Sequence, residues 1–348
     1  MNLNQLFSQT LKDGASDLHL VVGEKPTLRI HGQLKALNLP PVEDKELQTA
    51  LKEILSPEQL QRFMDERDVD VAYALDGARF RLNLHIQRGT WAMAARLIPT
   101  DIPSPESIGL NETLYGLTHL HQGFILVTGP TGCGKSTTLA VMINIINQER
   151  RSHIITIEDP VEFVYTKKQS LIEQREVSKD TPSFARALKY ILRQDPNIIL
   201  IGEMRDPETI EAALTAAETG HLVLSTLHTP SAAETVERII GAFPANQQQQ
   251  ILVQLAGSLK AVIAQQLLPR EDGQGQVAAR EILVNTPAVA NLIRENKISQ
   301  INSVIQTSRK DGMITMQSAI KQLMEAGTIS EDVAKNRIGN LETTATYF

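Results

Sequence analysis

The amino-acid sequence predicts an α/β protein of two domains, in which a smaller α+β domain precedes a larger domain built on a mostly parallel sheet. The length of 348 residues is enough for two cores at roughly 150 residues per domain. From about residue 114, apolar segments alternate with amphipathic helical segments, a pattern that favours parallel strands covered by helices. A glycine-rich segment lies between one such strand and the helix that follows it.

The composition excludes several classes of protein. With 34 Lys+Arg against 40 Asp+Glu the net charge is −6, and 42% of the residues are hydrophobic, so the chain is not predominantly disordered. A single cysteine cannot form an internal disulfide or a cysteine zinc site, and no segment has the apolar length of a signal peptide or a membrane span. The acidic balance and the 4% of aromatic residues argue against nucleic acid as a partner. We therefore expect a cytoplasmic protein that meets a membrane only peripherally.

The clearest element of the first domain is a β-hairpin. In residues 79–86, apolar side chains occupy the even positions and polar side chains the odd ones, the period of a half-buried strand. Arg79 and Arg81 therefore share the face opposite the core. After a turn, residues 90–98 form the second strand signal, which carries Arg96.

Shifts in composition predict the domain boundaries. Three prolines fall within seven residues from Pro99, and prolines block helix and sheet pairing, so this segment suits a semi-rigid connector. After residue 245 the apolar positions take helical spacing as far as Leu267, and shorter helices are expected from Pro287, Thr315 and Ser330. The predicted parts are an α+β domain at 1–98, a linker at 99–113, an α/β domain at 114–285 and a helical C-terminal region at 286–348.

Local signals also predict the elements of the larger domain. Thr181 and Asp206 are expected N-caps because a proline follows each of them, and Gly220 is expected to end the helix that begins after Asp206. The expected strands are residues 123–128, 154–157, 198–201 and 222–226.

The strongest chemical signal is a phosphate-binding loop of the form G-x-x-x-x-G-K-[ST], directly after the first of these strands and before a helix. Glycines let backbone N–H groups surround a phosphate, the lysine reaches the β- and γ-phosphates, and the serine hydroxyl holds Mg²⁺. Both flanks disfavour the alternative of a glycine-rich turn without a ligand, so ATP and Mg²⁺ are expected. The expected nucleotide-binding residues are Gly129, Pro130, Thr131, Gly132, Cys133, Gly134, Lys135, Ser136 and Thr137, with Cys133 as a small filler.

Two of the expected strands lead into carboxylates, Glu158 and Glu203. Ligands of open α/β sheets bind at the carboxyl ends of the strands, so both carboxylates are expected near the phosphates. Glu203 is expected to orient or activate the attacking water, and Glu158 to share that role; with Ser136 they are candidate Mg²⁺ ligands, partly through water. Gly202 stands where an aspartate commonly binds the metal.

Two histidines flank the strand expected at 222–226. His228 follows this strand and is expected at the same edge as the carboxylates, where a neutral imidazole could hydrogen-bond the γ-phosphate. His221 precedes the strand and is a further candidate for nucleotide binding, although a structural role is equally compatible with the sequence. The two are too far apart in sequence to bind one metal ion directly.

Together these segments resemble the Walker A, Asp box, Walker B and His box of the type II/IV secretion ATPases. Within that superfamily the chain resembles the type IV pilus retraction ATPases, the PilT/PilU family, in its length, in lacking a cysteine zinc site and in residues 288–295. The last segment is similar to the family signature A-I-R-N-L-I-R-E, from which Val289 and Ala290 depart. The four boxes are residues 129–136, 156–163, 200–206 and 220–229.

The resemblance implies a RecA-like ATPase domain, a PAS-like first domain and a homohexameric ring with nucleotide between neighbouring protomers. It also implies that Arg81 and Arg96, and less strongly Arg79, act as arginine fingers; the residues alone favour ordinary solvent-facing arginines. The implied activity is Mg²⁺-dependent ATP hydrolysis that powers pilus retraction and twitching motility. The implied partners are an inner-membrane platform protein at the pilus base and a paralogous retraction ATPase.

Other functions remain open on the sequence. An accessory, PilU-like retraction ATPase and a pilus-extension or type II secretion ATPase would share the same chemistry. A nucleic-acid translocase could use the same nucleotide-binding fold, although the acidic balance of the chain disfavours it. A scaffold whose ATP site only supports assembly is a further alternative.

Overall fold

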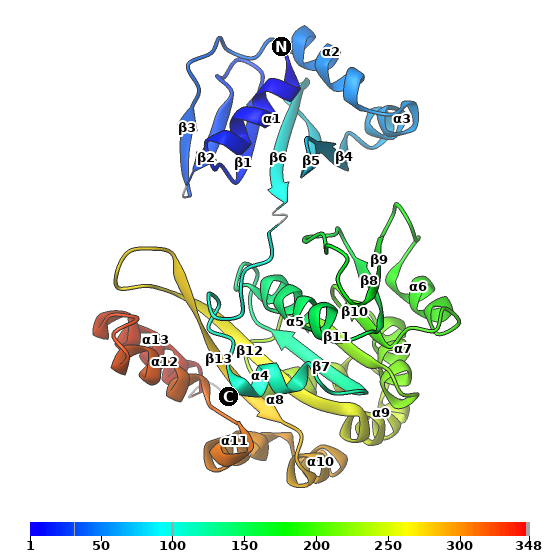
Figure 1. Cartoon of the computed structure of the whole chain (residues 1–348), viewed down its shortest axis with the longest axis vertical. Helices are drawn as coiled ribbons and strands as arrows, with labels where there is room; N and C mark the ends of the chain where they lie inside the picture. Colours follow the sequence, from blue (N-terminus) through cyan, green and yellow to red (C-terminus); the bar gives the residue numbers. More distant parts are fainter. Residues whose placement is uncertain (31, 99–100, 346–348) are drawn as a thin grey trace. The chain divides into compact units, whose positions relative to one another are not determined.

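The chain divides into two units, Met1–Asp101 and Ile102–Phe348, each with its own sheet and core (Figure 1). The computed structural model describes residues 1–30, 32–98 and 101–345, with side chains up to residue 339. The expected linker is therefore divided between the units, and its first two residues lie outside the described part of the chain. From Ile102 onward the linker belongs to the second unit.

The first unit is α+β, as expected, with a six-stranded antiparallel sheet in the order β3-β2-β1-β6-β5-β4. Its helices and the sheet share one apolar core, in which Phe7 packs on Phe80 and Phe63 meets the edge of Trp91. The elements are α1 (Leu3–Lys12), β1 (Asp17–Val21), β2 (Thr27–Ile30), β3 (Gln33–Ala36), α2 (Asp44–Ile54), α3 (Pro57–Glu66), β4 (Asp68–Leu75), β5 (Ala78–Gln87) and β6 (Thr90–Ile98).

The predicted hairpin is confirmed as β5 and β6. Arg88 and Gly89 form the two-residue turn with φ of 49° and 78°, the left-handed values that match the twist of an antiparallel pair. Along β5 the apolar residues are buried, and Arg79 and Arg81 alternate with them on the other face.

The second unit is built on a seven-stranded sheet in the order β13-β12-β7-β11-β10-β8-β9, in which only β13 is antiparallel to its neighbour. The elements of this sheet and its connections are α4 (Glu112–Leu117), β7 (Gly123–Thr128), α5 (Lys135–Glu149), β8 (His153–Glu158), β9 (Leu171–Glu176), α6 (Phe184–Ile191), β10 (Ile198–Ile201), α7 (Pro207–Glu218), β11 (Leu222–Leu227), α8 (Ala232–Gly241), α9 (Ala245–Ser258), β12 (Leu259–Pro269) and β13 (Gln276–Val284). The remaining helices are α10 (Pro287–Arg294), α11 (Ile301–Thr307), α12 (Met316–Glu325) and α13 (Glu331–Ala345), with 3₁₀ turns at Ile298–Gln300 and Arg309–Asp311.

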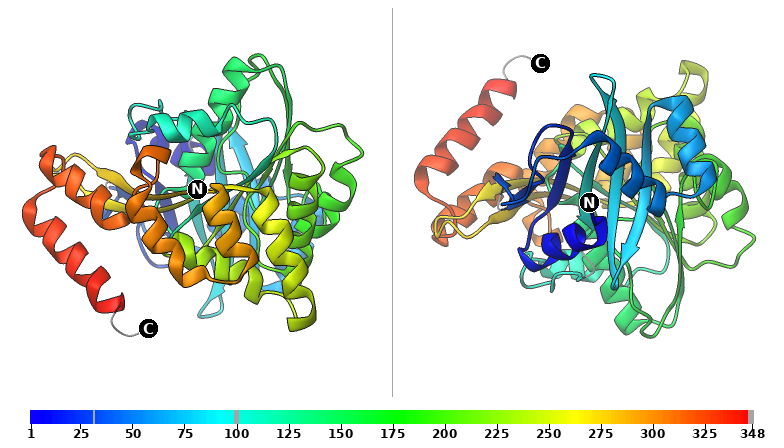
Figure 2. Two further views of the ribbon diagram at one scale, coloured as in Figure 1. Left: turned by 90° about the horizontal axis from the view of Figure 1, so that it is seen from below. Right: turned by 90° about the horizontal axis from the view of Figure 1, so that it is seen from above.

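Helices cover both faces of this sheet, because its central strands are apolar on both sides. The face that contains Phe124 and Ile155 packs on helices α6 to α10, and the face that contains Ile125 and Ile154 packs on α4 and α5. Helices α12 and α13 extend the unit beside the β12–β13 edge (Figure 2). No helix in the described ranges combines the length and the apolar character that crossing a bilayer requires.

The helix predicted from residue 245 to Leu267 is wrong in its second half. Helix α9 ends at Ser258, and Leu259 begins strand β12, which pairs with β7 on one side and β13 on the other. Nearly every residue of β12 is buried, so its apolar run lacks the alternation that distinguishes a strand from a buried helix. Strand β13, which pairs with it, was likewise not predicted.

Helix limits were predicted with mixed success. Asp206 caps α7 by accepting a hydrogen bond from Thr209 N, and the helix ends just before Gly220, as expected. Thr181 is not a cap: Ser183 accepts from the N–H of Arg186 and α6 begins after it. Strand β9 was missed.

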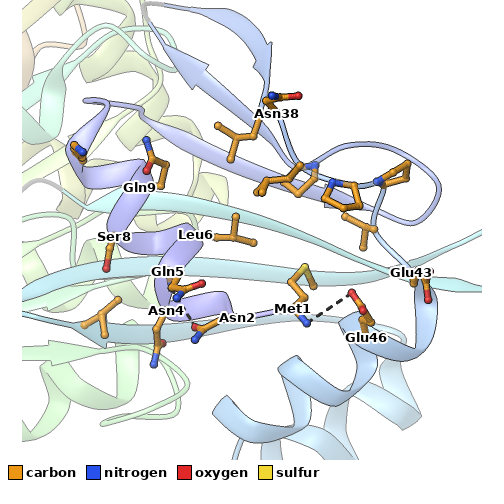
Figure 3. Close-up of a pocket in the computed structure, with 18 of the residues that line it drawn as sticks. Met1, Asn2, Asn4, Gln5, Leu6, Ser8, Gln9, Asn38, Glu43 and Glu46 are labelled. Carbon is orange, nitrogen blue, oxygen red and sulfur yellow. Dashed lines mark hydrogen bonds and ion pairs between the residues drawn. The ribbon is translucent and has the colours of Figure 1, made fainter.

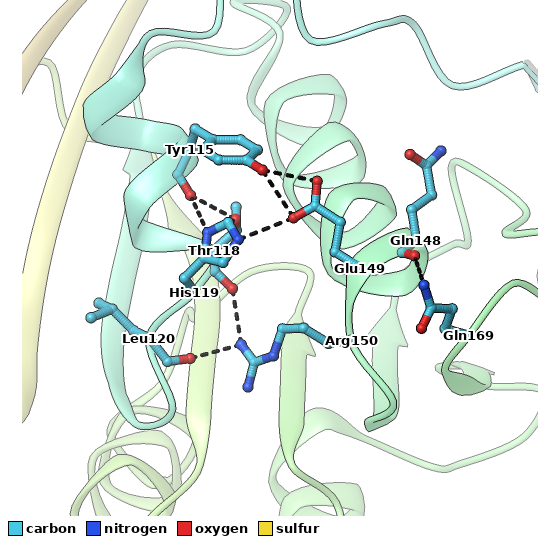
Figure 4. Close-up of polar contacts among 8 residues, drawn as sticks. All are labelled: Tyr115, Thr118, His119, Leu120, Gln148, Glu149, Arg150 and Gln169. Atoms are coloured by element: carbon cyan, nitrogen blue, oxygen red, sulfur yellow. Dashed lines mark hydrogen bonds and ion pairs between the residues drawn. The ribbon is translucent and has the colours of Figure 1, made fainter.

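Helix α4 is held to the end of α5 by polar side chains (Figure 4). Tyr115 Oη donates to the Glu149 carboxylate at 3.0 Å, and His119 Nε2 lies 3.0 Å from the same carboxylate. Arg150 Nη1 donates to the carbonyls of Thr118 and Leu120 at 2.9 and 2.8 Å. These contacts fix the segment that leads from the linker into β7.

Strand β13 carries a buried carboxylate that two helices share. Glu281 accepts hydrogen bonds from Ala232 N at 2.8 Å and from Met316 N at 3.4 Å, the first residues of α8 and α12. Both helix N-termini direct partial positive charge at the carboxylate. Burial nevertheless raises the pKa of Glu281 above its ordinary value, against the opposing effect of these two bonds.

We predict that Glu281→Ala lowers the free energy of unfolding by about 1–3 kcal/mol, because two buried N–H groups lose their acceptor. A carboxyl whose pKa is raised in the folded state stabilises the fold below its unfolded pKa, and this contribution disappears as pH rises through the folded pKa. Urea unfolding at several pH values should therefore show the wild type losing stability relative to Glu281→Gln from about pH 4 upward. The assignment would be contradicted if the free energy of unfolding of the wild type rose relative to that of Glu281→Gln over this pH range.

Candidate active site

Four parallel strands end at one edge of the second sheet. The register brings the ends of neighbouring strands within two residues of one another: Thr128 pairs with Leu227, Ile201 with Ser225, and Ile201 with Ile157. The loops that follow β7, β8, β10 and β11 therefore begin side by side. The loops carry the phosphate-binding residues, Glu203 and His228, and Glu158 is the last residue of β8, so the structure brings together most of the residues predicted from the motifs.

The phosphate loop turns sharply between β7 and α5. Gly129, Gly132 and Gly134 have φ of 135°, 79° and 84°, values that residues with a side chain rarely adopt. In the described part of the chain, the backbone N–H groups of Gly132 and Gly134 have no hydrogen-bond acceptor. Lys135 Nζ curls back and donates to the carbonyls of Gly129 and Pro130 at 2.9 and 3.1 Å. Free N–H groups, a helix N-terminus and an ammonium group thus converge, as phosphate binding requires.

The loop is pressed against the neighbouring strand β12. A Cβ at Gly129 would lie 2.3 Å from the carbonyl oxygen of Gln265, and one at Gly134 would lie 2.9 Å from Gln265 Nε2. Cys133, a residue of the loop itself, is buried, and burial raises the pKa of its thiol above the ordinary value, with Lys135 opposing the rise. The interpretation of Cys133 as a small filler accords with this environment, since a reactive thiol needs a lowered pKa.

Glu203 is held by the strands on both sides of it. Gly202 N donates to Ile157 O at 2.8 Å, Thr226 Oγ1 donates to Gly202 O at 2.6 Å, and Met204 N donates to Thr226 O at 3.3 Å. A Cβ at Gly202 would lie 3.3 Å from the Cα of Glu158, so the close approach of β8 accounts for a glycine where related motifs have aspartate. The backbone of Glu203 is therefore fixed at the strand edge.

The Glu203 carboxylate faces two cationic or titratable side chains. Arg205 Nη2 lies 2.6 Å from Glu203 Oε1, and His228 Nε2 lies 3.6 Å from Glu203 Oε2. Glu203 is only 15% exposed, whereas Arg205 is 75% exposed and free to move away. Arg205 was not predicted as a site residue; its place four residues beyond the end of β10 was the available signal.

Glu158 lies at the predicted strand edge but is buried there. Its carboxylate is buried and accepts hydrogen bonds from Thr156 Oγ1, from the N–H of Glu162 and from Gln174 Nε2, at 2.6, 3.3 and 3.3 Å. Burial raises its pKa above the ordinary value, and these three bonds oppose the rise. In this arrangement Glu158 shapes the loop after β8, and its catalytic and metal-binding roles stay predictions.

Glu162, on the same loop, is exposed and was missed as a candidate. Burial lowers the pKa of Lys135, and the charges of Cys133, Glu162 and Glu203 act in the opposite direction. Glu162 therefore lies close enough to the phosphate loop for its charge to act on the lysine. Its spacing of four residues from Glu158 was the sequence signal.

The two histidines lie at opposite ends of β11. His228 is at the edge described above, as predicted. His221 lies before the first residue of β11; its Nδ1 is 2.9 Å from Ala216 O, and its carbonyl accepts from Gly123 N at the start of β7. Five or six residues of extended strand separate this end from the phosphate loop, so the second unit does not bring His221 to the nucleotide-binding residues.

The predicted arginines lie in the first unit and have carboxylate partners there. Arg81 Nη2 is 2.8 Å from Asp70 Oδ2, and Arg96 Nε is 2.8 Å from Asp17 Oδ1. Burial alone would raise the pKa of each aspartate, but these hydrogen bonds lower both values below the ordinary one. Arg79 lies beside Arg81 on the same face of β5.

The first unit also contains a pocket of about 940 Å³ between α1 and the segment around Pro40 (Figure 3). Leu6 and the Met1 side chain line it, and the terminal amine of Met1 lies 3.6 Å from Glu46 Oε2. None of the motif residues takes part in this pocket. Among the described residues, no three His, Cys, Asp or Glu side chains are grouped to hold a metal ion.

Comparison with known proteins gives consistent similarities. A family model described as type II/IV secretion system protein matches residues 109–274. The type IV pilus retraction ATPase PilT of Pseudomonas aeruginosa is 44% identical over 338 residues, which cover 97% of this chain and 98% of the relative. A twitching motility protein of Neisseria gonorrhoeae is 48% identical over 91% of this chain and 85% of its own length. A crystal structure of the pilus retraction motor PilT with bound ADP superposes with a TM-score of 0.90, at 44% identity and 96% coverage of both chains.

The contact between the phosphate loop and β12 predicts unequal costs for two alanine substitutions. Gly129→Ala should lower the free energy of unfolding by more than about 2 kcal/mol, because the new methyl group overlaps the Gln265 carbonyl. Gly132→Ala meets nothing within 4 Å and should cost only the left-handed backbone penalty, about 1 kcal/mol. Urea unfolding of both variants checks this, and equal losses would contradict the packing described.

Proposed function

The chain belongs to the type II/IV secretion ATPase family, and on this premise we propose that it is an ATP-hydrolysing motor of type IV pilus retraction. One observation supports the ATPase activity above all: Lys135, Glu203 and His228 converge at the edge where four parallel strands end. The 44% identity to a pilus retraction ATPase over 97% of this chain supports retraction as the mechanical output.

The phosphate loop is proposed to bind the β- and γ-phosphates of ATP. The free N–H groups of Gly132 and Gly134 donate to phosphate oxygens, and Lys135 exchanges the loop carbonyls for the phosphates. This exchange replaces neutral acceptors by charged ones, so it strengthens the hydrogen bonds of the ammonium group. Burial of Lys135 adds to the preference for a charged partner.

The residues present fit a Mg²⁺ ion that is held mainly by nucleotide oxygens and water. Mg²⁺ commonly keeps several waters and takes one or two protein ligands beside substrate phosphates. Ser136, at the start of α5, is the proposed protein ligand, and Gly202 supplies no side chain. When bound, the ion neutralises charge on the phosphates.

Glu203 is the proposed base that orients the attacking water. In hydrolysis the water oxygen attacks the γ-phosphorus, the bond to the β-phosphate oxygen breaks, and the water gives up a proton. Glu203 can accept this proton once Arg205, which is largely exposed, moves away from its carboxylate. His228, 3.6 Å from Glu203, is placed to hydrogen-bond either the water or the γ-phosphate. Glu158 is proposed to position the loop after β8, and Glu162 on that loop offers a further carboxylate, which is exposed.

The active enzyme is proposed to be a homohexamer in which Arg81 and Arg96 of one protomer reach the nucleotide of its neighbour. Their present partners, Asp70 and Asp17, hold the two guanidinium groups by hydrogen bonds at 2.8 Å. Arg96 is 74% exposed despite this bond, so most of its donors are accessible. A platform protein of the inner membrane and a paralogous retraction ATPase are the proposed partners, with peripheral attachment at the pilus base.

An accessory retraction motor is the second candidate, because the sequence of helix α10 departs from the retraction signature at two positions. Val289 and Ala290, the two departures from the retraction signature, are buried against the core, whereas Arg294 is exposed.

A strain that lacks the protein should carry excess surface pili and fail to twitch if this chain is the main retraction motor. Complementation with wild type should restore motility, and Arg294→Ala should not. Absence of surface pili in the deletion strain would instead indicate an extension motor.

We predict that Lys135→Ala abolishes multiple-turnover phosphate release, with at least a hundredfold loss, because the charge-assisted contacts to the phosphates are removed. Lys135 is buried but donates only to two carbonyls of its own loop, so circular dichroism should stay close to wild type and the unfolding midpoint should fall only modestly. Phosphate release at the wild-type rate would refute the site.

We predict a different result for Glu203→Gln. The amide keeps the shape of the side chain but cannot accept the proton, so hydrolysis should slow by about 10²–10⁴-fold while ATP affinity is retained. Single-turnover hydrolysis and equilibrium ATP binding, measured on the same preparation, separate the two effects. Glu158→Gln in parallel tests how the two carboxylates divide the work.

A further inference from the structure

Strand β13 carries a buried guanidinium group that the proposed hydrolysis does not use. Arg280 is only 8% exposed, and burial lowers its pKa to about 10, so it remains charged at neutral pH. Its hydrogen-bond partners are neutral: Nε donates to Gln265 Oε1 at 3.1 Å, and Nη2 and Nη1 each donate at 2.9 Å to the carbonyls of Ile108 and Gly109. Within the described ranges no salt bridge joins Arg280 to a carboxylate. A buried charge is costly, so this arrangement needs a reason.

One partner of Arg280 contacts the phosphate loop directly. Gln265 Oε1 accepts from Arg280 Nε and from Thr138 Oγ1 at 2.8 Å, and Gln265 Nε2 donates to the carbonyl of Cys133. A guanidinium group can only donate, so the amide oxygen of Gln265 must face Arg280. The amide nitrogen is thereby turned toward the Cys133 carbonyl. Arg280 thus determines which end of Gln265 the phosphate loop meets.

The other partners of Arg280 belong to the segment that leads from the first unit. Residues 102–110 open the second unit, and within them Gly109 N donates to Glu106 O at 3.0 Å and Leu110 N to Pro105 O at 2.9 Å. These turns leave the carbonyls of Ile108 and Gly109 directed at Arg280. A continuous set of hydrogen bonds therefore runs from this segment through Arg280 and Gln265 to the phosphate loop.

We propose that Arg280 and Gln265 are positioning residues that couple the conformation of the phosphate loop to the conformation of residues 102–110. Nucleotide binding orders the loop, which holds Gln265 and Arg280 in place and with them the carbonyls of Ile108 and Gly109. By thermodynamic reciprocity, displacement of this segment weakens nucleotide binding. The proposal rests on the proposed nucleotide site, and it connects that site to residues 102–110 through the side chains of Gln265 and Arg280.

Gln265→Glu is the sharpest variant. The carboxylate still accepts from Thr138 and forms an ion pair with Arg280, so the fold retains its buried contacts. It cannot donate to Cys133, and two oxygens then oppose each other beneath the phosphate loop. Arg280→Met removes the donors while keeping an unbranched apolar side chain of similar reach. Glu281→Gln alters the adjacent buried ionisable residue, whose contacts are with α8 and α12, and serves as the matched control.

Three measurements on the full chain test the proposal: the Kd for fluorescent ADP, the urea midpoint, and amide hydrogen exchange with and without ADP. We expect Gln265→Glu and Arg280→Met to raise the Kd on the order of tenfold, and Glu281→Gln to leave it within about twofold. ADP should slow exchange in residues 102–110 of the wild type and of Glu281→Gln, but not of the other two variants. A purely structural role would lower the urea midpoint without removing this ADP-dependent protection.

Exchange without nucleotide separates failure of this proposal from failure of the proposed function. Gln265→Glu should speed exchange of the amides of residues 131–134 on the order of tenfold even in the absence of ADP. If the wild type binds no ADP but this acceleration is observed, the proposed function fails and the positioning role stands. The proposal would be overturned if Gln265→Glu and Arg280→Met both kept the wild-type Kd for ADP, the wild-type protection of residues 102–110 and the wild-type exchange rate of residues 131–134.

Discussion

Parallel pairing of the buried strands is the constraint on which the rest of the second unit depends. Because β7, β11, β10 and β8 run in the same direction and in aligned register, the residues after each strand begin at one edge. Each of these strands is apolar on both faces, so a shift along its neighbour would bring polar residues of the loops into the core. Burial thus fixes the register, and the register brings together side chains that are distant in sequence.

The geometry of the site follows from close packing at that edge. Gly202 lies where a Cβ would make a tight contact of 3.3 Å with the Cα of Glu158, and Gly129 lies where the phosphate loop meets β12. Polar contacts then complete the arrangement: Thr226 holds the carbonyl before Glu203, and Gln265 holds the loop before Lys135. Buried polar groups of this kind are stabilising only when all their partners are present. Substitution of these buried residues is therefore expected to disturb the site as much as substitution of its exposed residues.

Much of this could be predicted from local sequence, because the signals are local in origin. Left-handed glycines, the Asp206 cap and the alternation along β5 each reflect the conformation of a few neighbouring residues. Strand β12 could not be distinguished from a helix, since burial on both faces removes the period that separates them. The role of Gln265 depends on pairing between segments about 130 residues apart, which no local pattern encodes. His221 lies at the opposite end of β11 from His228, as the sequence predicted, and its role in nucleotide binding stays a prediction.

A structure with a non-hydrolysable ATP analogue and Mg²⁺ tests the central claim most directly. The account predicts the γ-phosphate at the shared strand edge, with Lys135 Nζ moved from the carbonyls of Gly129 and Pro130 to the phosphate and the Glu203 carboxylate facing the γ-phosphorus. Arg205 should have left Glu203, and Gln265 should still donate to Cys133. Nucleotide bound away from this edge, or Glu203 still paired with Arg205 and remote from the γ-phosphate, would contradict the account.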